Sequence, residues 1–170
     1  MHDPSFAAAL ALATGLRERG LKIVFAESCT AGLASATLAR IPGISEQHCG
    51  SAVVYRLDTK HEWLGVSRGL LEDPGPVSKE VAEAMATGVL KKTPEADVAA
   101  AITGHLGPNA PAGQDGLVWM AVASRAGSPN VSAKSTHLKW MERDIRQIEA
   151  AEHLLNYAAE AVTRLPSTMV

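Results

Sequence analysis

The sequence predicts an α/β fold in which a mixed sheet lies between two layers of helices, a three-layer α/β/α sandwich. Short apolar runs that are typical of buried strands alternate along the chain with segments that favour helices. Two of the runs, 117–123 and 131–139, stand close enough to pair as a hairpin, joined by a turn around Gly127-Ser128-Pro129. The chain shows no internal repeat, so we expect residues 1–170 to form one domain.

The N-terminal segment has clear helix boundary signals. Asp3-Pro4 is typical of an N-cap followed by proline at the first helical position, and Gly20 stands where a C-terminal glycine cap would. These signals predict an alanine-rich helix over 4–19. The apolar run that follows predicts a short buried strand over 21–26.

Small residues dominate the next segment, which predicts a helix over 30–40 that can approach a sheet closely. Ile41-Pro42-Gly43 ends this helix because proline and glycine both interrupt helical structure. A second apolar run predicts a strand over 49–55, and residues 58–64 are predicted to form a short helix.

The second half of the chain completes the alternating pattern. Ser78 is a candidate N-cap for a helix over 79–91, and the apolar run 97–102 predicts a buried strand. A loop over 103–116, with four glycines and two prolines, separates this strand from the predicted hairpin. A long final helix is predicted over 142–163.

Composition limits the function classes. The net charge is −2 and no basic block is present, which argues against non-specific binding of nucleic acid. Cys29 and Cys49 make no disulfide framework, as suits a reducing compartment. The apolar run 7–13 is too short to span a membrane, and Met-His-Asp-Pro lacks the basic start of a signal peptide. We therefore expect a soluble, cytoplasmic protein.

Three predicted strands are each followed by polar or glycine residues: Glu27-Ser28-Cys29-Thr30, the segment 55–60, and the segment 103–108. In α/β sheets, ligands bind at the carboxyl ends of strands. A serine there becomes a nucleophile only when a base takes its proton, and Lys60 is the obvious base since burial favours its neutral form. Tyr55 is a candidate to relay a proton or to hold the lysine.

The local pattern leaves other interpretations open. The N–H groups at the start of helix 30–40 are candidates for oxyanion stabilisation, but the same residues also suit a helix-capping corner beside a surface lysine. Cys29 paired with His105 is an alternative nucleophile, although a buried, inert cysteine is more common. His48, Cys49 and His61 fit no regular zinc spacing, so no metal is expected.

The motifs together resemble the CinA C-terminal domain family, whose stand-alone members are nicotinamide-nucleotide amidases of the PncC type. The resemblance covers about residues 5–160, with the motifs in the family's order. They are Glu27-Ser28-Cys29-Thr30-Ala31-Gly32, Gly50-x-x-Val53-x-Tyr55-x-x-x-x-Lys60, Leu64-Gly65-Val66, Val77-Ser78-x-Glu80-Val81-Ala82, and Thr103-Gly104-x-x-Gly107-Pro108.

This resemblance implies an amidohydrolase that converts nicotinamide mononucleotide to nicotinate mononucleotide and ammonia without a cofactor or metal. Ser28 would attack the carboxamide carbon, Lys60 would move the proton and Tyr55 would assist the lysine. Five further positions would shape the oxyanion and nucleotide pocket: Thr30, Gly32, Thr103, Gly104 and Gly107.

Arg143 and Arg146 lie one turn apart on the last predicted helix, in a region similar to the family's Asp-Arg-x-x-x-Arg. Arg143 is the first candidate for binding a substrate phosphate and Arg146 is the alternative, since guanidinium groups suit that geometry. Ion pairs with Glu142, Asp144 or Glu149 on a solvated helix face are the alternative. The helices rich in small residues also lead us to expect a homo-oligomer.

Three segments depart from the family pattern. Leu57 stands where the family has asparagine in Tyr-Ser-Asn-x-x-Lys, and Arg56 replaces the serine. The loop 105–115 is stiffer and loses a lysine that usually precedes the next strand. Two alternatives therefore stay open: a non-catalytic relative that binds a nucleotide or a protein partner, and a hydrolase of a different amide.

Overall fold

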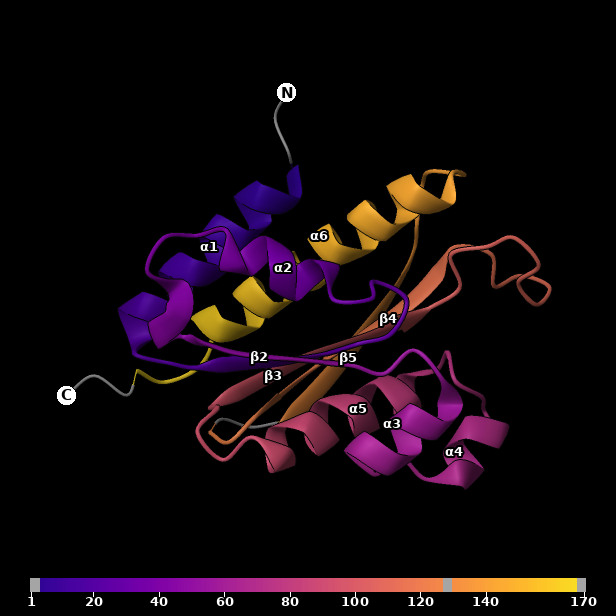
Figure 1. The fold of residues 1–170 in the computed structure, drawn as a ribbon, viewed down its shortest axis with the longest axis horizontal. Coiled ribbons are helices and arrows are strands. Elements are labelled where there is room, and N and C mark those ends of the chain that lie inside the picture. The colour runs from indigo at the N-terminus through magenta and orange to yellow at the C-terminus, as the bar shows by residue number, and fades with distance from the viewer. Residues whose placement is uncertain (1–3, 127–129, 168–170) are drawn as a thin grey trace.

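The computed structural model describes residues 4–126 and 130–167 (Figure 1). The predicted Asp3 cap and the predicted turn at 127–129 lie outside the described residues. The elements in chain order are α1 (Pro4–Arg19), β1 (Ile23–Glu27), α2 (Leu33–Ala39), the 3-10 helix η1 (Ile44–Glu46), β2 (His48–Val53), α3 (Leu57–Leu64), α4 (Arg68–Glu72), α5 (Lys79–Lys92), β3 (Val98–Gly104), β4 (Leu117–Ser124), β5 (Val131–His137) and α6 (Arg143–Thr163).

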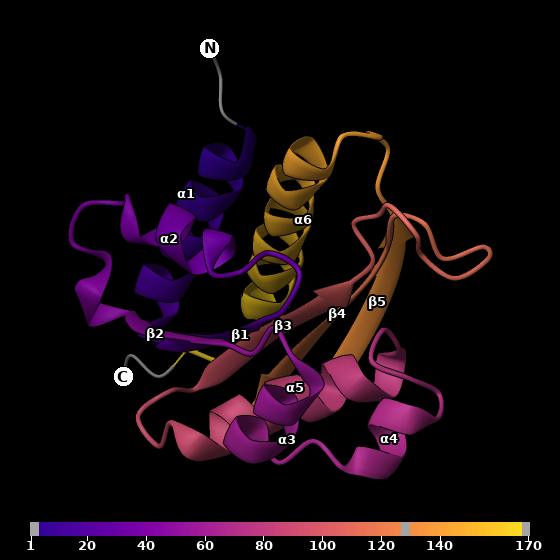
Figure 2. The ribbon, with the colours of Figure 1, turned by 45° about the vertical axis from the view of Figure 1, so that its right-hand side comes forward.

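The sheet has five strands in the order β2-β1-β3-β4-β5. β1 runs parallel to both β2 and β3, whereas β4 pairs antiparallel with β3 and β5. Helices α1, α2 and α6 cover one face of the sheet, and α3, α4 and α5 cover the other (Figures 1 and 2). The structure thus confirms the predicted three-layer sandwich with a mixed sheet, including the β4–β5 hairpin.

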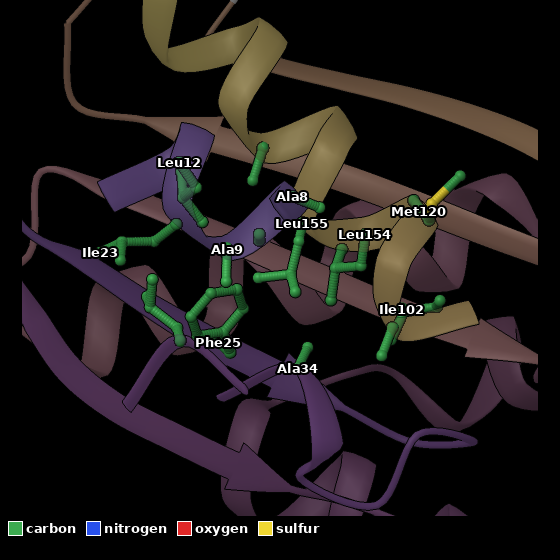
Figure 3. Close-up of a cluster of buried hydrophobic side chains, with 14 of the residues drawn as sticks. Ala8, Ala9, Leu12, Ile23, Phe25, Ala34, Ile102, Met120, Leu154 and Leu155 are labelled. Carbon is green, nitrogen blue, oxygen red and sulfur yellow. The ribbon is translucent and has the colours of Figure 1, made fainter. Parts of the chain in front are cut away.

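The central strands are buried because both of their faces pack against helices. All five residues of β1 are buried, and β3 is buried from Val98 to Thr103. Phe25 of β1 packs in one core with Leu12 of α1 and Leu154 of α6, as Figure 3 shows. A second core lies under α5, where small side chains of β3 such as Ala99 and Ala101 leave room for the helix. This burial on both faces explains the continuous apolar runs of the two strands.

Predicted and observed elements agree closely in kind and place. Ser78 caps α5 as predicted, because its side chain accepts a hydrogen bond from the Val81 N–H at 3.3 Å. Gly20 has a φ of 65°, the left-handed conformation that a glycine cap adopts. α2 begins at Leu33, three residues later than predicted, and the short elements η1 and α4 were not predicted. No helix in the described ranges is long and apolar enough to cross a membrane.

Helix α3, which carries Lys60, is held against α5 by a close backbone contact. A Cβ atom placed on Gly88 of α5 would lie 2.1 Å from the carbonyl oxygen of Leu64, so only glycine fits at this position. His61 Nδ1 also contacts the Val66 carbonyl oxygen at 2.8 Å just beyond the helix. These contacts fix α3 at the edge of the sheet where β1, β2 and β3 end.

Candidate active site

The turn after β1 presents Ser28 at the end of the strand. The Ser28 N–H donates to the carbonyl oxygen of Ile102 on β3 at 3.1 Å, which continues the sheet up to the serine. The Ser28 carbonyl then accepts from the Ala31 N–H at 3.0 Å, so the chain reverses at once. Ala31 has a φ of 52°, a conformation that L-residues other than glycine rarely adopt. The serine therefore stands on a tight, strained corner.

The Glu27 carboxylate organises this corner from inside. The residue has no exposed surface, and its two oxygens accept five hydrogen bonds. The donors are the Thr30 hydroxyl (2.7 Å), the N–H groups of Gly32 (3.1 Å), Ala34 (3.0 Å) and Ser35 (3.0 Å), and the Ser51 hydroxyl (3.1 Å). Glu27 therefore caps α2 and joins it to β2.

This arrangement favours the helix-capping alternative over oxyanion stabilisation by the N-terminus of the second helix. The N–H groups at the start of α2 have no acceptor within the helix and donate to the Glu27 carboxylate instead. A buried carboxylate needs several donors to replace the water that it loses. Thr30 and Gly32 both contribute to this network, and neither lines the cavity beside Ser28. The structure thus gives these two residues contacts that support the corner.

Lys60 reaches from α3 to the Ser28 side chain. Its amine lies 2.8 Å from Ser28 Oγ and donates a second hydrogen bond to the Val54 carbonyl oxygen at 3.0 Å. Both side chains belong to buried residues, with 2 % of the surface of Lys60 and 7 % of the surface of Ser28 exposed. This distance is within the hydrogen-bond range that proton transfer between a base and a nucleophile requires.

Burial lowers the pKa of Lys60 from its usual 10.5 to about 8, because a charged amine loses water that the protein does not replace. Nearby Cys29 opposes this shift only in part. In the part of the chain that the structure describes, Lys60 forms no ion pair with a carboxylate. Its neutral form is therefore accessible near neutral pH, as a general base must be.

Cys29 is poorly suited to act as a nucleophile. Burial raises the pKa of its thiol to about 12, which outweighs the opposing effects of nearby backbone N–H groups and of Lys60. Only 5 % of its surface is exposed, and it packs with the core under α6. The thiolate that would attack a substrate is therefore strongly disfavoured.

Tyr55 and Arg143 meet at the rim of the site. Arg143 Nη2 donates to the Tyr55 hydroxyl at 2.8 Å, and Arg143 Nη1 donates to the carbonyl oxygen of Gly107. No hydrogen bond joins Tyr55 to Lys60 in the described residues. The phenol is therefore placed to orient Arg143, and Arg143 presents a positive charge beside the loop after β3.

A cavity of about 260 Å³ brings most of the predicted site residues together. Ser28, Lys60 and Leu57 line it, and the segment 103–110 forms another part of its wall. The Thr103 hydroxyl donates to the Pro76 carbonyl oxygen at 2.8 Å, which ties this wall to the segment before α5. Further lining residues are Tyr55, Arg143 and His105.

Arg146 has a different role from Arg143, although the two residues lie one turn apart. Arg146 is 3 % exposed, and its guanidinium donates to both carboxylate oxygens of Asp115 at 2.9 and 2.8 Å. It also donates to the Leu106 carbonyl oxygen at 3.2 Å. The predicted ion-pair partners were Glu142, Asp144 and Glu149, whereas the observed partner Asp115 is 31 positions away and was not predicted. Asp115 in the otherwise uncharged 106–116 loop was the available signal.

The two histidines that were considered as zinc ligands, His48 and His61, have other contacts. His48 Nε2 lies 2.9 Å from the Ser35 hydroxyl, and His61 contacts a backbone carbonyl. Within residues 4–126 and 130–167, no group of three or more acidic, histidine or cysteine side chains is arranged to hold a metal ion. A buried serine beside an amine of lowered pKa is instead an arrangement suited to acyl transfer.

Comparison with known proteins shows which family the sequence matches. Residues 6–162 match the model of the CinA C-terminal domain family. A CinA-like protein of Geobacter metallireducens is 43% identical over 136 residues, and a CinA-like protein of Mycobacterium leprae is 37% identical over 151 residues. These alignments cover 79% and 86% of this chain but only 32% and 35% of the relatives. The chain thus spans about a third of the length of the curated relatives it matches.

Solved structures of proteins with similar names have the same fold. The crystal structure of a competence/damage inducible protein from Agrobacterium tumefaciens superposes with a TM-score of 0.87 at 29% sequence identity. The match covers 96% of this chain and 98% of that one.

Proposed function

The chain belongs to the CinA C-terminal domain family, and we propose that it is an amidohydrolase that converts nicotinamide mononucleotide to nicotinate mononucleotide and ammonia. The observation that carries this proposal is the 2.8 Å contact between Lys60 Nζ and Ser28 Oγ at the wall of a cavity. A buried serine hydroxyl has no reactivity of its own, but a neutral amine within hydrogen-bond reach can take its proton.

The proposed reaction proceeds in two stages. Neutral Lys60 accepts the proton of Ser28 as its oxygen attacks the carboxamide carbon. The resulting tetrahedral intermediate collapses when Lys60 returns that proton to the leaving nitrogen, so ammonia departs and an acyl-enzyme remains. Water then attacks the ester with Lys60 again as base. Lys60 passes the proton to the departing Ser28 oxygen as nicotinate mononucleotide is released. The lowered pKa of Lys60 supports both directions of proton transfer near neutral pH.

The substrate's phosphate is proposed to bind Arg143. This guanidinium lines the cavity and keeps donor capacity beyond its contacts with Tyr55 and Gly107. Arg146 is a weaker candidate because its donors already serve Asp115 and backbone carbonyls. The sugar and ring would lie along the wall formed by the segment 103–110.

Ammonia release from nicotinamide mononucleotide tests this proposal. The native protein should release ammonia, and the Ser28→Ala and Lys60→Ala variants should each lose at least about a thousandfold in kcat while remaining folded. Lys22→Ala is a matched control, because Lys22 is a half-buried lysine that pairs with Glu95 far from the cavity. Full activity in the Ser28→Ala variant would refute the assignment.

A second candidate function follows from Leu57. Its side chain lines the cavity where the family carries asparagine, so a substrate other than nicotinamide mononucleotide, with an apolar group at this position, would fit better. If this is correct, Leu57→Asn should raise kcat/KM for nicotinamide mononucleotide, and a panel of amides should reveal a better substrate for the native protein. Binding of the nucleotide by calorimetry without ammonia release would instead favour a non-catalytic relative.

We also propose a homo-oligomer in the cytoplasm. Four large apolar side chains lie exposed at the start of α6 and just before it, and such a patch is typical of protein interfaces. They are Trp140, Met141, Ile145 and Ile148. Light scattering after gel filtration should give a mass of at least two chains, and a single-chain mass would contradict the proposal.

A further inference from the structure

The loop that walls the cavity has little backbone hydrogen bonding of its own. His105 at its start and Gly116 at its end are joined by a bond from the Gly116 N–H to the His105 carbonyl oxygen at 2.9 Å. Between Leu106 and Ala110, however, no described backbone group bonds to another backbone group. The wall must therefore be held in place by side chains.

Two arginines of α6 hold it. Arg146 donates to the Leu106 carbonyl oxygen at 3.2 Å, and Arg143 donates to the Gly107 carbonyl oxygen. Arg146 also binds Asp115 near the other end of the loop through two hydrogen bonds. One buried guanidinium thus joins both halves of the loop to the helix.

The packing around Gly107 shows how closely the loop follows this ion pair. Gly107 has a φ of 69°, and a Cβ atom there would lie 2.7 Å from Asp115 Oδ1 and 2.9 Å from Arg146 Nη1. The backbone conformation therefore favours glycine, and a larger residue would push the side chains of the ion pair aside. A change in the pair would be transmitted directly to the wall.

The pair also sets the direction of one peptide group. In a trans peptide the C=O and the N–H point in opposite directions. Because the Leu106 carbonyl points to Arg146, the N–H of Gly107 points away from α6. Gly107 lines the cavity while Arg146 does not, and the Gly107 N–H has no acceptor in the described part of the chain. This N–H is therefore a free donor on the side of the peptide that faces away from Arg146.

We propose that the Asp115–Arg146 ion pair is a positioning device for substrate binding, which holds the Gly107 N–H toward the cavity so that it donates to an oxygen of the bound substrate. The donation of the Gly107 N–H to a substrate oxygen rests on the proposed function. The positioning of the loop by the ion pair does not. Arg146 and Asp115 act through the loop and touch no substrate. Of the two arginines, Arg143 lines the cavity and is the one that would contact the substrate.

Backbone ¹⁵N relaxation of the ligand-free protein tests the positioning directly. In the native protein the amides of Leu106, Gly107 and Asn109 should be as rigid as those of β3, with order parameters of about 0.85. In Asp115→Asn, which removes the charge at nearly constant volume, they should fall below about 0.6. Asp144→Asn is the control, an exposed aspartate on α6, the helix that carries Arg146, and should leave the loop rigid. A loop that stays rigid in Asp115→Asn would overturn the proposal.

Kinetics with nicotinamide mononucleotide separates positioning from a general loss of stability. Asp115→Asn should raise KM roughly tenfold or more while kcat stays within about twofold, since the lost contact is made in the bound ground state. Arg146→Lys, which keeps the charge but not the bidentate geometry, should give an intermediate KM. A lower melting temperature with unchanged KM, or a fall in kcat alone, would contradict the assignment. If the native protein releases no ammonia, the proposed function has failed, and the relaxation result alone then decides the positioning role.

Discussion

The amine of Lys60 and the hydroxyl of Ser28 lie 2.8 Å apart in the interior, although the two residues are 32 positions apart in the sequence. The contact joins α3, on one face of the sheet, to the corner that follows β1. It depends on the close packing of α3 against α5 at Gly88 and on the network that Glu27 makes behind Ser28. The site is therefore built from both helical layers, with the sheet between them.

The pH dependence of activity should report the pKa of Lys60. A base must be neutral, and with a pKa of about 8 only about a tenth of the Lys60 amines are neutral at pH 7. We expect kcat/KM for ammonia release to rise about tenfold per pH unit below pH 7 and to level off above about pH 8.5. A profile that is flat between pH 6 and 9 would contradict Lys60 as the base.

Lys60→Met should abolish activity and stabilise the fold at pH 7. The native amine is protonated there at the cost of burial, and a lowering of the pKa from 10.5 to about 8 corresponds to roughly 3 kcal/mol. Lost hydrogen bonds to Ser28 and Val54 offset part of this gain, so we expect about 1–2 kcal/mol in the free energy of unfolding.

The pH dependence of the stabilisation expected from Lys60→Met is the control. Between about pH 8 and 10.5 the unfolded chain binds more protons at Lys60 than the folded chain, so the native protein gains stability as the pH rises through this window. The advantage of Lys60→Met should therefore shrink toward pH 10 in denaturant titrations. If the difference in unfolding free energy between Lys60→Met and the native protein is the same at every pH, the burial of charge at Lys60 is not its cause.

Tyr55→Phe distinguishes the predicted role of this residue from its observed contacts. The sequence suggested that Tyr55 assists Lys60, but its hydroxyl accepts from Arg143 at 2.8 Å. We therefore expect a severalfold rise in KM for nicotinamide mononucleotide, with the pH at which kcat/KM levels off unchanged. A shift of that pH would restore the predicted partnership with the lysine.

The difference between these two roles illustrates what sequence alone can predict. Ser28 and Lys60 were candidates because each follows an apolar strand and carries a side chain suited to acyl transfer, and because both stand in motifs that resemble the CinA C-terminal domain family. The contact between Tyr55 and Arg143 spans 88 positions and depends on how α6 crosses the sheet edge, which no local pattern specifies. The same holds for the pairing of Arg146 with Asp115.

The fold was more predictable than the site because it depends on patterns repeated over many residues. The burial of β1 and β3 on both faces produces continuous apolar runs, and the caps at Ser78 and Gly20 are local signals. Helix α4 was missed since its five residues are too few to show a periodicity. Ile145 and Ile148 fit the apolar pattern of α6 yet are 36% and 40% exposed, because a pattern does not reveal what covers a face.

Glu27→Gln should strongly destabilise the protein. An amide offers one acceptor oxygen, and its nitrogen would face N–H and O–H donors that now bond to the carboxylate, leaving buried donors without partners. We expect a loss of about 3 kcal/mol or more in the free energy of unfolding, measured by urea titration. Glu46→Gln is the matched control, because this exposed carboxylate in η1 should change stability by less than about 0.5 kcal/mol.

Ala31→Gly and Ala36→Gly should shift stability in opposite directions, although both replace an exposed alanine in the segment that follows Ser28. Ala31 has a φ of 52°, where an L-residue costs about 1–2 kcal/mol that glycine does not. Since glycine also gives the unfolded chain more freedom, at a cost of about 0.5–1 kcal/mol, we expect Ala31→Gly to be stabilising by roughly 0.5–1 kcal/mol.

Ala36 lies in α2, where glycine lowers stability by about 1 kcal/mol. Thermal unfolding of the two variants tests whether the backbone of Ala31 is strained. Equal destabilisation by the two substitutions would show that it is not. If the strain is real, Ala31→Gly should also lower kcat, since a relaxed corner holds Ser28 less firmly against Lys60. A more stable but slower enzyme would show that the tight turn at Ala31 serves to present the nucleophile.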